Sequence, residues 1–166
     1  MESEWTGTGT EWSRDAGNGL LLRLAVPEDI PQITAIEQAE FAVPWSEESI
    51  RHDILENPAS RWLILADREG TVIAYTALWL VIDEGHVLNV AVRGADQGKG
   101  YGKLIMTALI ELAESEGMRL MTLEVRRSNL RAQGLYHRCG FLDVGYRKRY
   151  YDDNKEDALI MYKDLV

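Results

Sequence analysis

The chain has 166 residues, a mass of 18.8 kDa, and a composition of 46% apolar and 27% charged residues. These values are ordinary for one folded domain with its own core, so they exclude disorder over the whole chain. The formal net charge of −9 argues against nucleic acid as the main partner, because phosphate binding requires a basic surface.

The N-terminal segment differs in composition from the rest of the chain. Residues 1–19 are rich in Gly, Thr, Ser and Glu and show no apolar period. We therefore expect a disordered leader at 1–19 that precedes one domain over residues 20–166. Trp5 and Trp12 are unusual in such a leader and could dock on the domain, although we favour a mobile tail.

Three elements are predicted at the start of the domain. A strand at residues 20–26 precedes a helix that begins after Pro27 and whose apolar stripe includes Glu37. Ser46 can cap a second helix, which ends near Asn57-Pro58 because the residue before proline disfavours helical backbone.

The remainder predicts an α+β fold. The apolar runs at 62–67 and 72–81 form a hairpin across Arg68-Glu69-Gly70, and another strand follows at 86–92. A long amphipathic helix then ends at Gly117, which tolerates left-handed backbone. We expect the last elements to be a strand at 120–125, a helix at 130–138, and strands at 141–149 and 158–162. The order predicts a single α+β domain with a mixed sheet.

A glycine-rich turn, Gln97-Gly98-Lys99-Gly100-Tyr101-Gly102, separates the strand at 86–92 from the long helix. Backbone N–H groups left free at a helix start suit a phosphate, which indicates a phosphorylated cofactor. The spacing is not that of a P-loop, since no Gly-x-x-x-x-Gly-Lys-Ser/Thr motif is present.

Glu124 and Tyr136 are the candidate acid–base pair downstream of the turn. On a period of two, Glu124 shares a strand face with Thr122, and we expect burial near the sheet to raise the pKa of its carboxyl. The alternatives are an ion pair between Glu124 and Arg126 or Arg127, and a core-packing role for Tyr136.

Several kinds of site are not expected. The single cysteine excludes an internal disulfide, and the three histidines show no metal-ligand spacing, so we expect no metal. No signal peptide or membrane-spanning stretch is visible in the sequence, and we therefore expect a cytoplasmic location.

The motifs resemble those of a known enzyme family. Gln97-x-x-Gly100-x-Gly102 is similar to the acetyl-CoA pyrophosphate loop of the GNAT superfamily of N-acetyltransferases, and Asn129-x-x-Ala132-x-x-Leu135-Tyr136-x-x-x-Gly140-Phe141 resembles a second GNAT signature. Within the superfamily, five blocks resemble the ribosomal-protein-alanine acetyltransferases (RimI group). They are Pro44-Trp45-Ser46, Leu88–Val92, Leu123–Arg126 with Ser128-Asn129, Tyr150-Tyr151, and Glu156-Asp157-Ala158. The group often has Asp-Pro where this chain has Arg93-Gly94, which leaves the affinity for cofactor open.

The resemblance implies a central sheet, mostly antiparallel, that splays between its fourth and fifth strands to admit the pantetheine arm of acetyl-CoA. It implies Glu124 as general base, Tyr136 as general acid, and Arg147, Tyr150 and Tyr151 on the acceptor side. The residues implied to bind acetyl-CoA are Val90, Ala91, Val92, Gln97, Gly98, Lys99, Gly100, Tyr101, Gly102, Lys103, Leu104 and Asn129.

The acceptor expected from the resemblance is the N-terminal α-amine of a protein, alanine on a small-subunit ribosomal protein. Neutralising a lysine costs about 3.5 kcal/mol more than neutralising an α-amine, which favours the same acceptor. A small-molecule amine such as a polyamine, or a non-catalytic acyl-CoA-binding role, are the alternatives. We expect no direct contact with nucleic acid or membrane.

Overall fold

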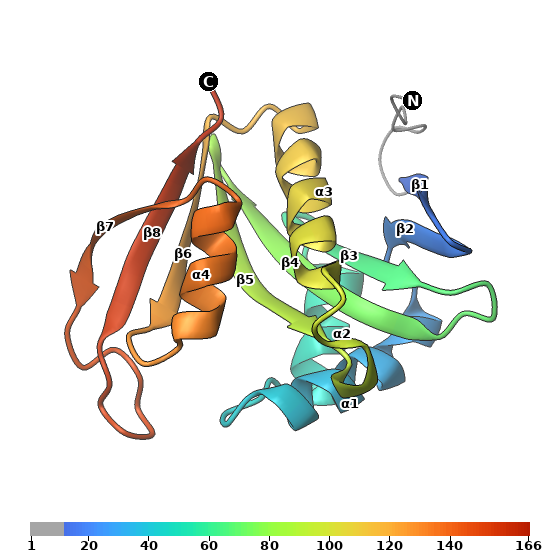
Figure 1. The fold of residues 1–166 in the computed structure, drawn as a ribbon, viewed down its shortest axis with the longest axis horizontal. Coiled ribbons are helices and arrows are strands. Elements are labelled where there is room, and N and C mark those ends of the chain that lie inside the picture. Colours follow the sequence, from blue (N-terminus) through green and yellow to red (C-terminus); the bar gives the residue numbers. More distant parts are fainter. Residues whose placement is uncertain (1–11) are drawn as a thin grey trace.

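The computed structural model describes residues 12–166 (Figure 1). Its strands are β1 (Ser13–Gly17), β2 (Leu20–Leu24), β3 (Ser60–Ala66), β4 (Val72–Val81), β5 (Glu84–Val92), β6 (Leu120–Arg126), β7 (Leu142–Arg147) and β8 (Ala158–Asp164). Its helices are α1 (Ile30–Glu40), α2 (Glu47–Glu56), α3 (Tyr101–Ser115) and α4 (Leu130–Arg138), with short 3-10 turns η1 (Pro27–Asp29) and η2 (Gly94–Asp96).

The eight strands form one mixed sheet in the order β1-β2-β3-β4-β5-β6-β8-β7. Only β5 and β6 run parallel, and every other neighbouring pair is antiparallel. The parallel pair is joined by a crossover through α3, which is the connection that parallel strands require. The expected α+β class, with a mixed and mostly antiparallel sheet, is therefore confirmed.

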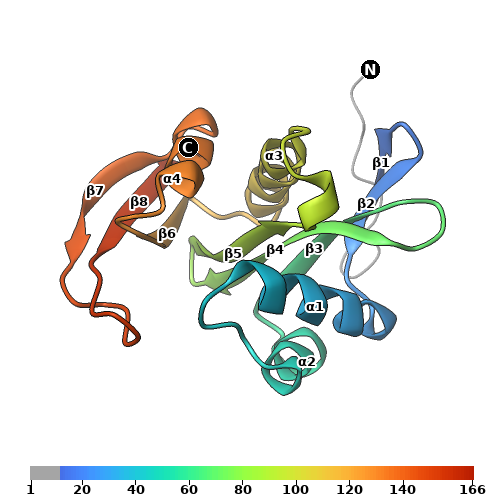
Figure 2. The ribbon, with the colours of Figure 1, turned by 60° about the horizontal axis from the view of Figure 1, so that its bottom comes forward.

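The helices cover both faces of the sheet, so β3 is buried on both sides. In Figure 2, α3 and α4 lie on one face and α1 and α2 on the other. The cluster on the α3 side includes Leu63 and Leu65 of β3, and the cluster on the α1 side includes Trp62 and Ile64 of the same strand. This explains why β3 is continuously apolar from Trp62 to Ala66.

The sheet splits between β5 and β6, as the resemblance implied. These are the fourth and fifth strands predicted from the sequence, because β1 was not among the predicted strands. Their pairing covers only three residues, from Glu84↔Leu120 to His86↔Thr122. Beyond that point β5 carries a bulge, because Thr76↔Val90 and Leu78↔Val87 leave one extra residue on β5. A bulge bends its strand, and here it turns β5 away from β6 (Figure 1).

The bulge itself is held by polar contacts. Asn89 Nδ2 donates to Glu37 Oε1 at 3.0 Å, and Thr76 Oγ1 donates to the Asn89 carbonyl at 2.9 Å. Both partners are buried, at 1% exposure for Glu37 and 0% for Thr76. The bent course of β5 is therefore fixed by the core beneath it.

The prediction of a disordered leader over residues 1–19 is wrong for residues 12–19. Residues 13–17 form β1, which pairs with β2 across a turn in which Gly17, Asn18 and Gly19 all have positive φ. Trp12 is 8% exposed and belongs to the α3-side core. Trp5 lies outside the described residues. Docking of Trp12, the less favoured alternative, is the observed arrangement.

The helix boundaries follow the expected capping signals. Ser46 Oγ accepts a hydrogen bond from Ser49 N–H at 3.1 Å and caps α2, which ends at Glu56 before Asn57. Gly117 has φ of +81° and follows the end of α3. These predictions from sequence are confirmed.

Candidate active site

A cleft of about 550 Å³ opens where β5 and β6 separate. It brings together ten of the residues predicted to bind acetyl-CoA, which are Val90, Ala91, Val92, Gln97, Gly98, Gly100, Tyr101, Gly102, Lys103 and Asn129. Sequence reasoning did not predict the other lining residues, which are Glu40, Phe41, Asp96, Arg131, Ala132, Leu135 and Arg138. A smaller hollow of about 210 Å³ beside α1 contains none of the predicted residues.

Two of the residues predicted to bind acetyl-CoA, Lys99 and Leu104, do not line this cleft, and neither do the predicted catalytic and acceptor-side residues, which are Glu124, Tyr136, Arg147, Tyr150 and Tyr151. Lys99 Nζ lies 3.3 Å from Asp96 Oδ1 and forms an ion pair with it. Leu104 packs against the core on the α3 side. Both belong to the turn and the start of α3, so they support its shape from outside the cleft.

The glycine turn presents unpaired backbone donors to the cleft. Gly98 and Gly100 have φ of +79° and +85°, a conformation that L side chains rarely adopt, and Gly100 is the N-cap of α3. The first intrahelical bond runs from Leu104 N–H to the Gly100 carbonyl at 3.1 Å. The N–H groups of residues 101–103 precede that bond, so they remain available to an anion at the positive end of the helix dipole.

The side chain of Gln97 ties the walls of the cleft together. Its Nε2 donates to Glu40 Oε2 at 2.8 Å and to the Val92 carbonyl at 3.1 Å, while its Oε1 accepts from Arg131 at 3.1 Å. One side chain thus links the end of α1, the end of β5 and the start of α4. Lys103, Arg131 and Arg138 place positive charges around the cleft, which suits a polyphosphate ligand.

Asn129 fixes the start of α4 on the opposite wall. Its Oδ1 accepts a hydrogen bond from Ala132 N–H at 3.1 Å, so the residue is the N-cap of the helix as well as part of the cleft lining. The helix then carries Leu135 into the cleft and Tyr136 into the core.

Glu124 lies on β6 beyond the point where the strands separate. Its Oε2 is 2.6 Å from His86 Nε2, and its Oε1 is 3.7 Å from Arg147 Nε. The alternating burial of β6 places Met121, Leu123 and Val125 in the core, so Glu124 is on the opposite face, as predicted.

The expected raised pKa of Glu124 is wrong. The hydrogen bond with His86 lowers the pKa of the Glu124 carboxyl below its ordinary value of 4.5 and outweighs the opposing effect of burial. The positive charge of Arg147 acts in the same direction. The alternative pairing of Glu124 with Arg126 or Arg127 does not occur among the described contacts.

Tyr136 is 7% exposed, and its ring packs edge-on against Phe141 at a centroid distance of 6.0 Å. Burial, followed by the nearby Tyr151, raises the pKa of the Tyr136 phenol. Glu124 in turn raises the pKa of Tyr151, so Tyr151 is electrostatically coupled to both candidate catalytic groups. Among the described residues the Tyr136 hydroxyl has no hydrogen-bond partner, but Tyr136 belongs to the α3-side core and is not among the residues that line the cleft.

The predicted acceptor-side residues come from the end of β7 and the connection to β8. Tyr150 and Tyr151 pack edge-to-face with a centroid distance of 5.1 Å, and Tyr150 is 46% exposed. Burial raises the pKa of Tyr151 to about 12, and the nearby Arg126 opposes that rise. Arg126 lies over the Tyr151 ring at 4.0 Å, an arrangement that fixes the ring beside β6.

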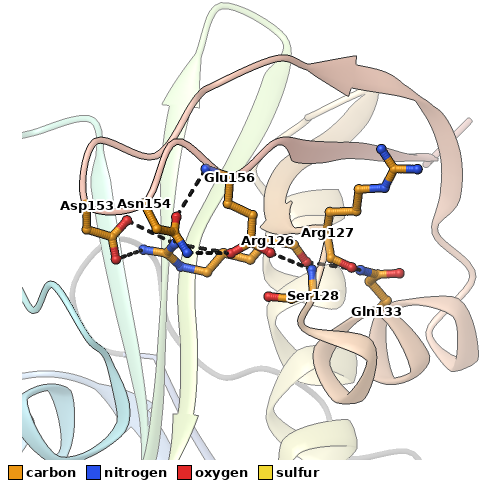
Figure 3. Close-up of polar contacts among 7 residues, drawn as sticks. All are labelled: Arg126, Arg127, Ser128, Gln133, Asp153, Asn154 and Glu156. Atoms are coloured by element: carbon orange, nitrogen blue, oxygen red, sulfur yellow. Dashed lines mark hydrogen bonds and ion pairs between the residues drawn. The ribbon is translucent and has the colours of Figure 1, made fainter.

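A polar network fastens this connection to β6 (Figure 3). Arg126 donates to three side chains at 3.1 to 3.4 Å, which are Asp153, Asn154 and Glu156. Glu156 Oε2 accepts a further bond from Ser128 N–H at 2.6 Å. The connection that carries Tyr150 and Tyr151 is therefore hydrogen-bonded to Arg126, at the end of β6, and to Ser128 just after that strand, although it has no regular secondary structure.

Sequence reasoning assigned no polar role to two groups beside this site. Glu37 was placed on the apolar stripe of α1, and the structure shows it hydrogen-bonded to Tyr75, to Asn89 and to Trp45 N–H. Burial raises the pKa of Glu37. A carboxylate on an apolar stripe was the signal for that network, whereas nothing near His86 in sequence indicates its contact with Glu124.

Two kinds of site are not found in the described part of the chain. Residues 12–166 contain no group of three or more His, Cys, Asp or Glu side chains placed to hold a metal ion. No helix in the same region is long and apolar enough to span a membrane.

The divided sheet, the glycine turn at a helix start and the cleft between them are features of an acyl-CoA-dependent transferase fold. Residues 30–141 match the model of the acetyltransferase (GNAT) family. The chain belongs to this family, and it is an acetyl-CoA-dependent N-acetyltransferase, as the motifs implied.

Within the family, the chain is similar to individual characterised enzymes and solved structures. A ribosomal protein bS18-alanine N-acetyltransferase from Haemophilus ducreyi is 37% identical over 145 residues, which are 85% of this chain and 97% of that protein. The crystal structure of the ribosomal-protein-S18-alanine N-acetyltransferase from Escherichia coli superposes with a TM-score of 0.79 at 32% identity, covering 88% and 94% of the two chains. A spermidine N-acetyltransferase from Vibrio cholerae, in complex with CoA and spermine, has a TM-score of 0.75 over 88% and 95% of the chains.

Proposed function

We propose that this protein transfers the acetyl group of acetyl-CoA to the N-terminal α-amine of ribosomal protein bS18, which begins with alanine in the mature acceptor. The observation that supports this acceptor most is the similarity to bS18-alanine acetyltransferases over nearly their full length. The spermidine enzymes share the fold at 19–21% identity, so they carry no argument about the acceptor. Such a reaction belongs in the cytoplasm, where ribosomal proteins are made.

The residues of the cleft fit acetyl-CoA. The free N–H groups of residues 101–103 and the positive charges of Lys103 and Arg131 are suited to the pyrophosphate. The strand segment Val90–Val92 has no partner strand on the β6 side among the described residues, so its backbone groups can bind the amides of pantetheine. The thioester supplies an acyl carbon with a good leaving group, since a thiol has a pKa near 8.5, as for cysteine.

Glu124 is proposed to receive the proton of the attacking amine. An α-amine with a pKa near 8 is roughly one-tenth neutral at pH 7, so the nucleophile is already present. A carboxylate whose pKa lies below 4.5 is a weak base toward a free ammonium ion. It can instead hold the neutral amine by a hydrogen bond and accept its proton as the new N–C bond makes the nitrogen acidic.

Tyr136 is proposed to stabilise the departing thiolate. Its raised pKa keeps the phenol protonated at physiological pH, and its hydroxyl is a free donor. Complete transfer of that proton to a thiolate of pKa near 8.5 is uphill. We therefore assign Tyr136 a hydrogen bond to the sulfur, and solvent supplies the proton after the thiolate has left.

Incubation with acetyl-CoA and a panel of acceptors tests the proposal, with mass spectrometry as the readout. The panel contains the first residues of bS18 starting at alanine, the same peptide with its α-amine blocked and a lysine added, and spermidine. We expect acetylation of the free α-amine only. Turnover of spermidine without any acetylated peptide would refute the proposed acceptor and leave the family assignment intact.

A further inference from the structure

His86 and Glu124 meet at the point where the sheet divides. His86 is the last residue of β5 that pairs with β6, and it lies opposite Thr122. Glu124 follows Thr122 by two residues, so the side chains of His86 and Glu124 project from the same face of the sheet. The distance of 2.6 Å between His86 Nε2 and Glu124 Oε2 is therefore a consequence of the strand register.

The imidazole of His86 packs against the neighbouring strand β4. His86 pairs with Trp79 in the β4–β5 register, and their rings meet edge-on with a centroid distance of 6.3 Å and an interplanar angle of 80°. Trp79 Nε1 in turn donates to both oxygens of Asp53, at 3.1 and 3.2 Å. Asp53 is 5% exposed, so a buried carboxylate anchors the ring against which His86 packs.

We propose that His86 is the positioning residue of the acetyl transfer, and that its Nε2–H holds Oε2 of Glu124 and directs Oε1 toward the acceptor amine. The inference rests on the proposed role of Glu124 as the group that receives the amine proton. A carboxylate has two oxygens, and the contact with His86 occupies one of them. The other is 3.7 Å from Arg147 Nε, on the acceptor side.

The other charged and titratable groups around Glu124 are weaker candidates for this role. Arg147 of β7 is farther away and its side chain is 58% exposed, so solvent screens its effect on the carboxylate. Glu124 raises the pKa values of Tyr150 and Tyr151, from the β7–β8 connection, but neither tyrosine is among the groups that shift the pKa of Glu124. Because the His86 contact is also the largest influence on the pKa of Glu124, losing it changes a measurable property of the carboxylate.

Two variants of His86 and one control distinguish the role of its N–H donor from that of its aromatic ring. His86→Phe keeps an aromatic ring against Trp79 and removes the donor. His86→Gln restores an N–H donor without the ring. His52→Phe is the matched control, because His52 makes a similar contact with Glu56, at 2.7 Å, on the exposed surface of α2.

The readouts are the pKa of Glu124 and the kinetics of acetyl transfer. The pKa is measured by NMR titration of ¹³C-glutamate-labelled protein, with the Glu124 resonance assigned by its loss in Glu124→Gln. In His86→Phe we expect this pKa to rise. We also expect kcat toward the alanine-starting peptide to fall about tenfold or more, since a misplacement of about 1 Å can cost 10²-fold, while the KM for acetyl-CoA is unchanged.

We expect His86→Gln to recover most of the lost kcat and His52→Phe to match the wild type in both readouts. An unchanged Glu124 pKa in His86→Phe would overturn the proposal, as would a kcat equal to that of His52→Phe, or an equal loss in the Phe and Gln variants. If the wild type does not acetylate the peptide, the proposed acceptor fails, and the NMR titration still decides whether His86 controls Glu124.

Discussion

Gly102 offers a test in which stability and cofactor binding change in opposite directions. It lies in the first turn of α3 and lines the cleft. A Cβ added there would be 3.4 Å from Leu135 Cδ2 and 3.9 Å from Val92 Cγ2, which is ordinary van der Waals contact. The free protein therefore accepts alanine without strain, and Gly102→Ala should stabilise the helix by about 0.5–1 kcal/mol.

The same methyl group stands between the two walls of the cleft, where the ligand must approach the backbone. We expect it to cost at least one hydrogen bond to a charged phosphate, about 1.5–3 kcal/mol, which corresponds to a roughly 10- to 150-fold weaker Kd for acetyl-CoA. Calorimetry measures the Kd. Thermal unfolding of the cofactor-free protein should show a Tm higher by about 1–4 °C.

Gly134→Ala is the matched control. Gly134 is also helical, but it does not line the cleft. Its added Cβ meets only the end of the Arg138 side chain at 3.3 Å, and this flexible cleft residue can shift by a few tenths of an ångström and keep its charge at the cleft. We expect a similar gain in stability and an unchanged Kd. If Gly102→Ala binds acetyl-CoA as tightly as the wild type, the glycine turn is not where the pyrophosphate binds, and the reasoning from its free N–H groups is refuted.

Three further predictions concern the catalytic groups and the core beneath them. Glu124→Gln should lower kcat/KM for the alanine peptide roughly 10²-fold at every pH from 6 to 9, because the carboxylate accepts the proton of the neutral amine as it attacks; wild-type rates in the variant across that range would contradict its role. Tyr136→Phe should slow single-turnover transfer by about tenfold or more with no change in acetyl-CoA Kd; a change in Kd alone would instead indicate a packing role. Asp53→Ala should lower the free energy of unfolding in urea by about 3 kcal/mol or more, since it removes the acceptor of Trp62 Nε1–H at 2.6 Å; a loss below about 1 kcal/mol would show that another acceptor replaces it.

The contribution of Asp53 to stability should also depend on pH, which adds a second measurement to the unfolding experiment. Burial disfavours its ionisation, but hydrogen bonds led by Ser60 and Asn57 outweigh burial and lower its pKa below the ordinary value of 3.8. Because the folded pKa is the lower one, this stabilisation is fully present above pH 3.8 and is lost as the pH falls through the folded value. The difference in stability between wild type and Asp53→Asn should therefore shrink at the acidic end.

Local patterns predicted most of the elements, because apolar periodicity, caps and turn residues act over a few positions. The exception was β1, whose residues Ser13–Gly17 have almost no apolar character and become a strand by pairing with β2. The Asn18-Gly19 dipeptide is typical of a hairpin turn and therefore indicates the β1–β2 hairpin in the sequence. Composition outweighed it in the prediction, which is why residues 12–19 were assigned to a leader.

The sequence indicated which residues are candidates for the site, but not how their side chains contact one another. Motif spacing made Glu124 and Tyr136 the acid–base candidates, a role that stays a prediction. The predicted sign of the Glu124 pKa shift was wrong because it depends on a partner 38 positions away. That contact exists only once the parallel register of β5 and β6 is set. Arg131 and Arg138 lie on α4 at helical spacing, and their position beside the glycine turn follows from tertiary packing alone.

A sheet that divides acquires two edges in the interior of the molecule. Beyond His86 on β5 and Thr122 on β6, the facing sides of these strands have no partner strand in the described structure. Proteins usually guard exposed edges with charge, proline or a covering element, because an open edge recruits other chains. Here the end of β5 lines a cleft together with the glycine turn and the start of α4. In the binding mode proposed above, the pantetheine amides take the place of a missing strand along this edge, and the bound cofactor covers it.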